Sequence, residues 1–275
     1  MDKSKDKLVL QTFLWIFCIL FIIPILFVII NSFKGYGEIL INSLALPKGM
    51  NFENYVEVWK DTRYYLVFCN TLFITAASTT VIVVLASMTG YKLSRSKNRI
   101  SWLILTYFLF SMMIPFQTIM IPMAKLVKSL SLSDNLLALV LIYAGTTCSF
   151  SILLYHGFTK TVPHEIEESA LIDGCHSVRM YFRIVFPLLK PVTSTVIILS
   201  IVTYWNDLIL PLILIRNKNL YTITLSQLIF FGEYGQNRIN LLLTSAVISS
   251  VPIILVYVFA QKYMISGIMS GAVKT

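Results

Sequence analysis

Residues able to carry out enzyme chemistry are few in this sequence and do not gather into a known pattern. Its histidines, at positions 156, 164 and 176, follow no metal-ligand spacing, so we expect surface or interfacial side chains. Its four cysteines contain no Cys-x-x-Cys pair, so neither a disulfide nor a metal site is predicted. There is no Gly-x-x-x-x-Gly-Lys-Ser/Thr phosphate loop. We therefore predict no catalytic residues, no metal and no ATP binding by this chain itself.

The polar group in the most unusual setting is Asp207, the only acid within a predicted membrane-spanning segment. Ionisable side chains in a membrane are costly and are usually functional. Together with Tyr204, Trp205 and Asn206, it could line a permeation path, where an aromatic face and hydrogen-bonding groups would suit a sugar. The alternative is structural, because Asn206 and Asp207 could instead cap a break in the helix before Pro211. Both interpretations stay open from the sequence.

A charged segment between Pro163 and Pro191 stands out in the apolar second half of the chain. Proline suits the first turn of a helix, where its missing N–H is not needed, and carboxylates suit the same turn because of the helix dipole. Gly174 is expected to end this first helix. The charged side chains are mostly acidic before the glycine and basic after it: Glu165, Glu167, Glu168 and Asp173, then Arg179, Arg183 and Lys190.

A second amphipathic helix is predicted from Ser177, followed by prolines that lead into the next apolar segment. Its apolar residues are spaced to share one face: Val178, Tyr181, Phe182 and Val185. The sequence therefore predicts a helix–turn–helix segment, made of a short helix, a glycine turn and a second helix, which projects from a membrane. Such a projection is expected to contact another protein.

Composition places most of the surface of the chain in lipid. Hydrophobic residues make up 57% and charged residues 13% of the sequence, against a soluble norm of about 25% charged. Six apolar segments are each long enough to cross about 30 Å of hydrocarbon. They are residues 8–30, 66–88, 102–121, 136–155, 191–215 and 241–259. The first is too long for a signal peptide and lacks a small-residue cleavage site, so we expect it to be retained.

Loop charge predicts the orientation. The loop 91–99 carries only basic charges, at Lys92, Arg95, Lys97 and Arg99, which indicates the cytoplasmic side. Both termini are then cytoplasmic, while residues 31–65 and 216–240 lie outside. Such loops explain the net charge of +9, and no nucleic-acid partner is expected because no basic helix is present. The fold class is therefore an all-α, polytopic membrane protein with six transmembrane helices.

Smaller features are predicted between the spans. Short surface helices are expected at 52–59 and 122–132. Pro115 is expected to kink the third span, since proline frees a backbone carbonyl. Ser133, Asp134 and Asn135 offer caps for the fourth span.

The charged segment also carries a family resemblance. Glu168-Ser-Ala-Leu-Ile-Asp-Gly174, followed by Ile184-Val-Phe-Pro187, resembles the EAA loop of the membrane-spanning subunits of ATP-binding-cassette (ABC) importers, in the carbohydrate-uptake, maltose-type branch. Ser169 stands where alanine is usual, and Phe186 where leucine is usual. Trp205-Asn206-Asp207 with Pro211, and the tail 261–275, are similar to the same permeases. The resemblance covers roughly residues 66–275 and implies the type I ABC importer transmembrane-domain fold.

The resemblance implies a docking role for residues 163–187, the coupling loop. In that family, this loop seats on separate ATPase subunits, which bind ATP and magnesium. The residues carried over to ATPase coupling are Glu165, Glu168, Ser169, Ala170, Asp173 and Gly174. The implied domains are 1–65, with the N-terminal tail, first span and external loop, and 66–275, the permease core.

The implied function is that of a non-enzymatic permease subunit in a bacterial cytoplasmic membrane, forming half of a sugar translocation path. Its implied partners are ABC ATPase subunits, a second homologous permease, an extracellular solute-binding protein and membrane lipid. The same branch also takes glycerol-phosphate or polyol-like solutes, so these remain alternatives. A multi-pass membrane enzyme would need clustered His, Asp or Glu, which are absent from the sequence. A stand-alone, proton-coupled carrier would rely on Asp207.

Overall fold

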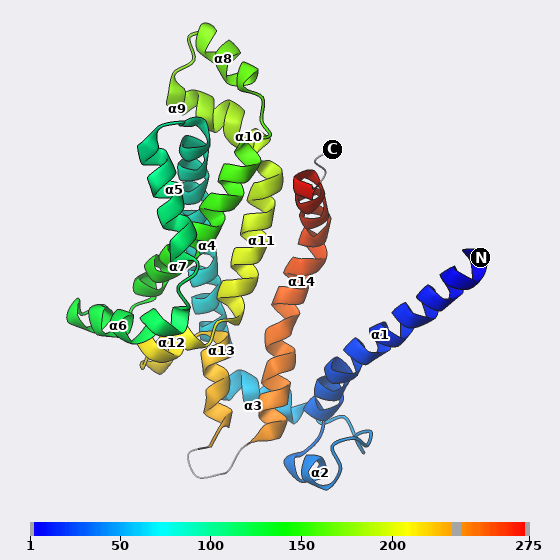
Figure 1. Cartoon of the computed structure of the whole chain (residues 1–275). Helices are drawn as coiled ribbons and strands as arrows, with labels where there is room; N and C mark the ends of the chain where they lie inside the picture. Colours follow the sequence, from blue (N-terminus) through cyan, green and yellow to red (C-terminus); the bar gives the residue numbers. More distant parts are fainter. Residues whose placement is uncertain (1–2, 233–237, 273–275) are drawn as a thin grey trace. The chain divides into compact units, whose positions relative to one another are not determined.

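The computed structural model describes residues 3–232 and 238–272, and every regular element among them is a helix (Figure 1). The chain divides into two compact units, one of Met1–Tyr65 with Ser226–Pro252 and one of Leu66–Leu225 with Ile253–Thr275. The predicted division into domains 1–65 and 66–275 stays a prediction. The end of the tail that carries part of the family resemblance, residues 273–275, lies outside the described residues.

Four helices are long and apolar enough to cross a membrane, and two bent helix pairs raise the number to six if each pair is one span. These counts refer to the described residues. The four helices are α1 (Lys3–Ser32), α4 (Tyr64–Arg95), α7 (Leu136–Thr159) and α14 (Ile239–Ala272). The predicted all-α, polytopic fold is confirmed. Helix α4 continues through most of the predicted loop 91–99, because Tyr91 and Arg95 pack against other parts of the unit.

The third span is interrupted rather than kinked. Helix α5 (Arg99–Ser111) ends before Pro115, and α6 (Phe116–Ser129) continues at an angle of 99° to it. Pro115 has extended backbone, with ψ of 136°, and so begins a new helix. The short surface helix was predicted to start at Pro122, which is wrong: Pro122 lies inside α6, whose amphipathic pattern runs through it.

The fifth span also differs from the single helix predicted over 191–215. Helix α11 (Lys190–Asn206) ends at Asp207, and α12 (Ile209–Leu214) follows after the break. The carboxylate of Asp207 accepts the backbone N–H of Ile209 at 3.0 Å and of Leu210 at 3.3 Å. This is the capping arrangement considered from the sequence, because the first amides of a helix have no intrahelical partner. Of the three caps predicted for the fourth span, Ser133, Asp134 and Asn135, the structure uses Asn135, whose side chain accepts the N–H of Leu137 at 2.8 Å.

The first unit holds short helices beside the ends of two long ones. Its short helices are α2 (Tyr36–Ile41) and α3 (Glu53–Asp61), and the second confirms the helix predicted at 52–59. Val58 of α3 packs with Phe230 and Leu241, and Arg238 forms ion pairs with Glu57 and Asp61. Segment 218–230, whose residues up to Leu225 belong to the second unit, contains short turns: a 3-10 helix at Lys218–Leu220, α13 (Ile223–Ser226) and a 3-10 helix at Gln227–Phe230.

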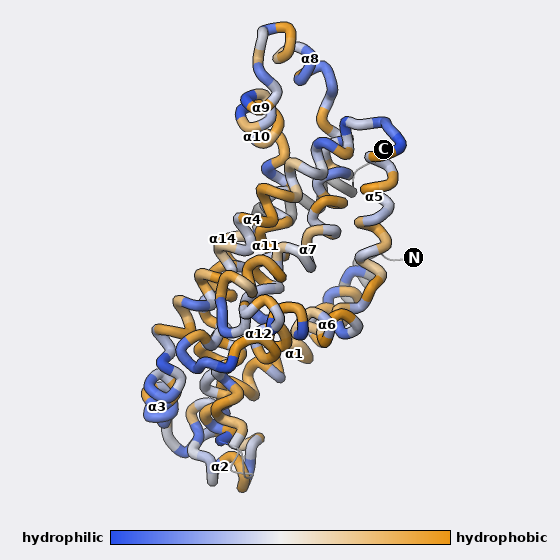
Figure 2. Tube along the Cα trace, turned by 90° about the vertical axis from the view of Figure 1, so that its left-hand side faces the viewer, coloured by the Kyte–Doolittle hydropathy of each residue, from blue (hydrophilic) through white to orange (hydrophobic). Residues whose placement is uncertain are grey.

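A large core of the second unit is built between α4, α7 and α11. Its buried members come from these helices and from the segment 162–189: Ile82, Ala86, Leu93, Ile152, Tyr155, Val162, Tyr181, Val185, Leu189, Val192 and Val196. Figure 2 shows apolar residues along the three helices and hydrophilic residues near α8 (His164–Ile172). The polar segment predicted to project from the membrane is thus fixed to the spans through a shared apolar core.

Candidate functional site

The coupling loop has the predicted helix–turn–helix form. Helix α8 follows Pro163 and ends at a Schellman motif, in which Cys175 N–H donates to Ala170 O at 2.9 Å and Gly174 N–H donates to Leu171 O at 3.0 Å. Gly174 has φ of +73°, a left-handed conformation that favours glycine. The predicted glycine turn is confirmed.

The second half of the loop is more irregular than the single helix predicted from Ser177. Helix α9 (Ser177–Met180) passes into a π-helical turn, Tyr181–Val185, and then into α10 (Phe186–Leu188). Tyr181 and Val185 are buried, whereas Val178 and Phe182 are exposed. The four apolar residues were predicted to share one face, but only Tyr181 and Val185 belong to the core.

The residues expected to couple to an ATPase lie mostly on the open side of the loop. Glu165, Glu168, Ser169, Asp173 and Gly174 are exposed, and Ala170 is buried. The Ser169 hydroxyl donates to Glu165 O at 2.8 Å, so it is used within the helix. Large apolar side chains are exposed beside them, above all Ile172, whose exposed fraction is 86%. The tip of the loop therefore presents carboxylates and apolar groups together.

The same loop is anchored on its inner side by a buried ion pair that no local pattern in the sequence predicts. Arg95 Nη2 lies 2.6 Å from Glu167 Oε1, and the exposed fractions of the two side chains are 11% and 8%. Tyr91 donates its hydroxyl to the other carboxylate oxygen at 2.8 Å, and Arg95 also donates to Val162 O at 2.8 Å. Helix α4 thus holds both the start of the loop and α8.

A second contact between α4 and the loop lies next to this pair. Tyr181 donates its hydroxyl to Ser87 at 2.7 Å, and its ring centroid is 5.2 Å from that of Tyr91. Segment 162–189 therefore contacts α4 through polar and aromatic side chains and shares an apolar core with α4, α7 and α11.

The residues proposed for a permeation path divide into two places. Tyr143 of α7 donates its hydroxyl to Asp207 at 2.7 Å and packs against Tyr204, with ring centroids 4.7 Å apart. Tyr204 also shares a 2.5 Å hydrogen bond with Thr147. Asp207 is therefore joined to a buried tyrosine pair, in addition to capping α12. Asn206 is exposed and donates to Val202 O at 2.8 Å, within its own helix.

Trp205 lies on a different side of α11 and lines a cavity of about 360 Å³ with residues of α4 and α14. Thr75, Thr79 and Thr80 line the same cavity. Thr75 and Thr79 are buried, and within the described structure their hydroxyls have no hydrogen-bond partner. The cavity therefore combines an aromatic face with hydroxyl groups that are available to a bound molecule or a neighbouring helix.

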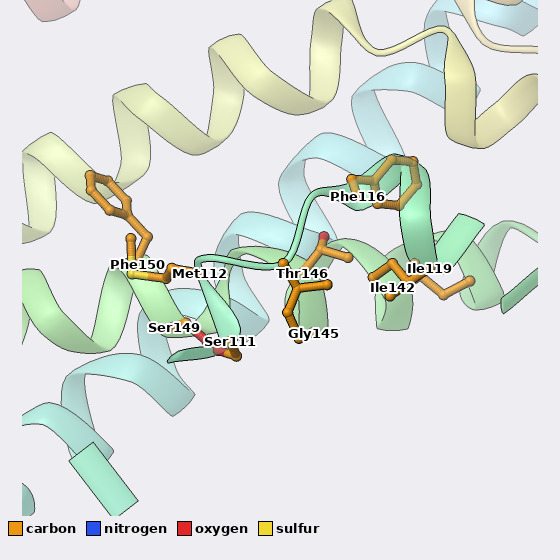
Figure 3. Close-up of a pocket in the computed structure, with 10 residues that line it drawn as sticks. Ser111, Met112, Phe116, Ile119, Ile142, Gly145, Thr146, Ser149 and Phe150 are labelled. Atoms are coloured by element: carbon orange, nitrogen blue, oxygen red, sulfur yellow. Dashed lines mark hydrogen bonds between the residues drawn. The ribbon is translucent and has the colours of Figure 1, made fainter. Parts of the chain in front are cut away.

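Two further cavities of the second unit lie around α6. One, of about 540 Å³, opens at the bend between α5 and α6 and is mainly apolar, with Ser111, Thr146 and Ser149 as its hydroxyl-bearing residues (Figure 3). The other lies between α6 and α12. Within the described part of the chain, no group of three His, Cys, Asp or Glu residues could hold a metal ion.

Comparison with known proteins identifies the class. The sequence profile of the family described as "binding-protein-dependent transport system inner membrane component" matches residues 82–269, a range that includes the whole coupling loop. The chain belongs to this family. It is therefore an inner-membrane component of a transport system rather than a member of an enzyme family.

Individual relatives are similar over almost the whole chain. A probable starch degradation products transport system permease protein of Thermoanaerobacterium thermosulfurigenes is 38% identical over 100% of both chains. A melibiose/raffinose/stachyose import permease protein of Bacillus subtilis is 30% identical over 92% of this chain and 91% of its own. A chain from a bacterial ABC transporter involved in alginate import has a TM-score of 0.83, with 21% identity, covering 96% of this chain and 98% of that chain. The last comparison shows that the fold is that of an ABC importer permease.

Proposed function

We propose that this chain is a permease subunit of an ATP-driven, binding-protein-dependent importer, and that its solute is a carbohydrate. The names of its relatives support the solute class, since they refer to starch degradation products and to melibiose, raffinose and stachyose. The chain itself hydrolyses no ATP in this proposal. A separate ATPase binds ATP and magnesium.

The observation that carries the proposal is the two-sided construction of the coupling loop. Its outer side presents exposed apolar residues with Glu165, Glu168 and Asp173 around them, which suits a docking surface with an apolar centre and a polar rim. Its inner side is fixed to α4 by the Glu167–Arg95 pair. A partner that pushes α8 would therefore move the membrane helices as well, because the loop and the spans share a core.

The translocation path is proposed to pass the polar groups inside the second unit. Trp205 supplies an aromatic face with Thr75 and Thr79 beside it, and Tyr204 and Asp207 supply hydrogen-bonding groups near Tyr143. Aromatic faces with a few placed polar groups suit the alternating apolar and hydroxyl surfaces of a sugar. A second, homologous permease supplies the other half of the path. An extracellular solute-binding protein delivers the solute, and both termini lie in the cytoplasm.

The proposal is tested by co-purification with the Gly174→Asp variant. Gly174 has a left-handed backbone and open space around it, so the substitution adds a charge at the docking surface and strains the turn. Gly49→Asp is the matched control, because Gly49 also has no atom near its Cβ position. The wild type and the control should bring down an ATPase whose hydrolysis responds to a candidate sugar, and Gly174→Asp should lose binding or coupling. If no ATPase accompanies the wild type under gentle extraction, the proposal fails.

A further inference from the structure

The cavity between α6 and α12, the α6–α12 pocket, combines positive charge with apolar walls. Its volume is about 530 Å³. Three cations line it, Lys125 and Lys128 from α6 and Arg216 from the segment after α12. The apolar part of the lining comes from the same two helices: Met120, Ile121, Ala124, Ile213 and Leu214. Such a lining matches a ligand with an anionic head and an apolar tail.

Asp134 also lines the pocket, and its one negative charge against three cations leaves the lining net positive. Its carboxylate accepts the backbone N–H groups of Arg216 at 2.6 Å and Asn217 at 2.8 Å, and its own N–H donates to Leu214 O at 3.0 Å. The amides of Asn217 and Arg216 hold the pKa of this carboxyl below its usual range. The carboxylate of Asp134 thus holds the segment that carries Arg216 through its backbone amides, and two positive charges remain in excess in the lining.

The pocket lies at the end of the second unit away from the coupling loop. Helix α7 separates the two places, and its 24 residues correspond to a length of about 36 Å. Figure 1 shows α6 and α12 side by side at one end of α7 and α8 beyond the other. This distance is close to the thickness of a bilayer, so the pocket lies near the membrane–water boundary opposite α8.

Helix α6 has the character of a helix that lies in this boundary. It is turned by 99° from α5, so it cannot continue along that span. Ile121, Leu126 and Leu130 are exposed on and just after it, beside exposed Lys125 and Lys128. Apolar and basic side chains exposed together on one amphipathic helix are typical of contact with anionic lipid.

We propose that the α6–α12 pocket binds an anionic phospholipid. The lipid phosphate lies among Lys125, Lys128 and Arg216, and an acyl chain lies along the apolar wall. A soluble phosphate would use the cations but not the wall, and an acidic protein surface would leave the apolar part of the pocket uncovered. The inference rests on this pocket and not on the identity of the transported solute.

The test uses photoreactive phospholipids with the full-length protein in bilayers, together with any subunits that accompany it. Phosphatidylglycerol and phosphatidylcholine with the same photoreactive acyl chain are compared, and labelled peptides are mapped by mass spectrometry. Phosphatidylglycerol should label residues 116–129 and 209–216 preferentially. Each cation near an anionic lipid is worth about fivefold in affinity, so removing all three should weaken labelling by up to roughly 100-fold.

The variant is Lys125→Gln, Lys128→Gln and Arg216→Gln combined. The matched control replaces three cations elsewhere in the unit, Lys97, Arg99 and Lys160, and should leave labelling of residues 116–129 unchanged. Equal labelling by both lipids in the wild-type protein overturns the proposal, whether or not the variant folds. Competition by glycerol 3-phosphate as strong as by phosphatidylglycerol would identify a soluble-phosphate site instead. Cross-linking of this surface to an acidic protein, without lipid labelling, would identify a protein-docking surface.

Discussion

The Arg95–Glu167 pair gives the sharpest quantitative prediction, through the substitution Arg95→Met. Glu167 loses the guanidinium that contacts it at 2.6 Å and keeps only the Tyr91 hydroxyl at 2.8 Å. Val162 O loses its donor as well. Methionine fills much of the volume of the arginine stem, so the change removes charge more than packing.

The expected size of the effect follows from the burial of both side chains, which are 11% and 8% exposed. Removing one partner of a buried ion pair lowers the free energy of unfolding by about 3–5 kcal/mol, because the remaining charge is left uncompensated. Replacing both partners by apolar residues costs much less, since no charge is stranded. The double variant Arg95→Met with Glu167→Met should therefore recover most of the loss.

Hydrogen exchange of the α8 backbone, with the protein in bilayers, measures this effect locally. In Arg95→Met, the amides of residues 164–172 should exchange at least about 100-fold faster, which corresponds to the lower end of the expected cost. Exchange in α7 should change less, because α7 keeps its own core contacts. Uptake should fall in parallel if the loop transmits force through this pair.

Two results would refute the reasoning. Unchanged exchange of α8 in Arg95→Met would show that the core alone holds the loop. Equal losses in the single and double variants would show that the effect comes from packing rather than from an uncompensated carboxylate.

Further predictions concern the packing, the turn at Asp134 and the path. Gly90→Ala should lower the free energy of unfolding by about 1–3 kcal/mol in a thermal unfolding assay, because the added Cβ would lie 2.6 Å from Tyr155 Cβ and 2.9 Å from two backbone atoms. Gly157 has open space around it, so Gly157→Ala should be neutral or stabilising in the same assay. The Asp134 carboxyl has a lowered pKa, so its stabilisation is complete above its usual pKa of about 3.9 and is lost as pH falls through the lower folded value. Asp134→Asn should therefore have a lower melting temperature than the wild type at neutral pH. In acid, the difference in melting temperature between the two proteins should become smaller. Tyr143→Phe removes the 2.7 Å hydrogen bond to a carboxylate and should reduce solute uptake several-fold without loss of the ATPase, whereas Tyr107→Phe, at a side chain 69% exposed, should leave uptake unchanged.

Local signals in the sequence predict the local structure of the coupling loop well. Pro163, the acids after it and Gly174 predict a helix, its start and its end, and the structure has all three. Asn135 likewise caps α7 as its residue type predicts. These features depend on neighbouring residues alone, so no tertiary information is needed.

Contacts between residues that are far apart in the chain cannot be predicted from such local signals. In the sequence, Glu167 is one of several carboxylates near a helix start, but its partner Arg95 is 72 residues away. Asp207 and Tyr143 are 64 residues apart. Nothing in the local pattern marks such partners. The interruption at Pro115 was underestimated for a related reason, because sequence gives the break in hydrogen bonding but not the 99° direction of the following helix.

The central claim, that the coupling loop docks on a separate ATPase, is tested most directly by site-specific cross-linking from Ile172. This side chain is 86% exposed at the tip of the loop, and Leu44, 84% exposed in the first unit, is the matched control. A photoreactive amino acid is placed at each position in otherwise wild-type protein in intact membranes. The account predicts a cross-link from position 172 to an ATPase subunit, changed in yield by ATP, and none from position 44. If the photoreactive residue at position 172 cross-links only to lipid, or to no ATPase subunit, the claim that the loop docks on an ATPase is contradicted.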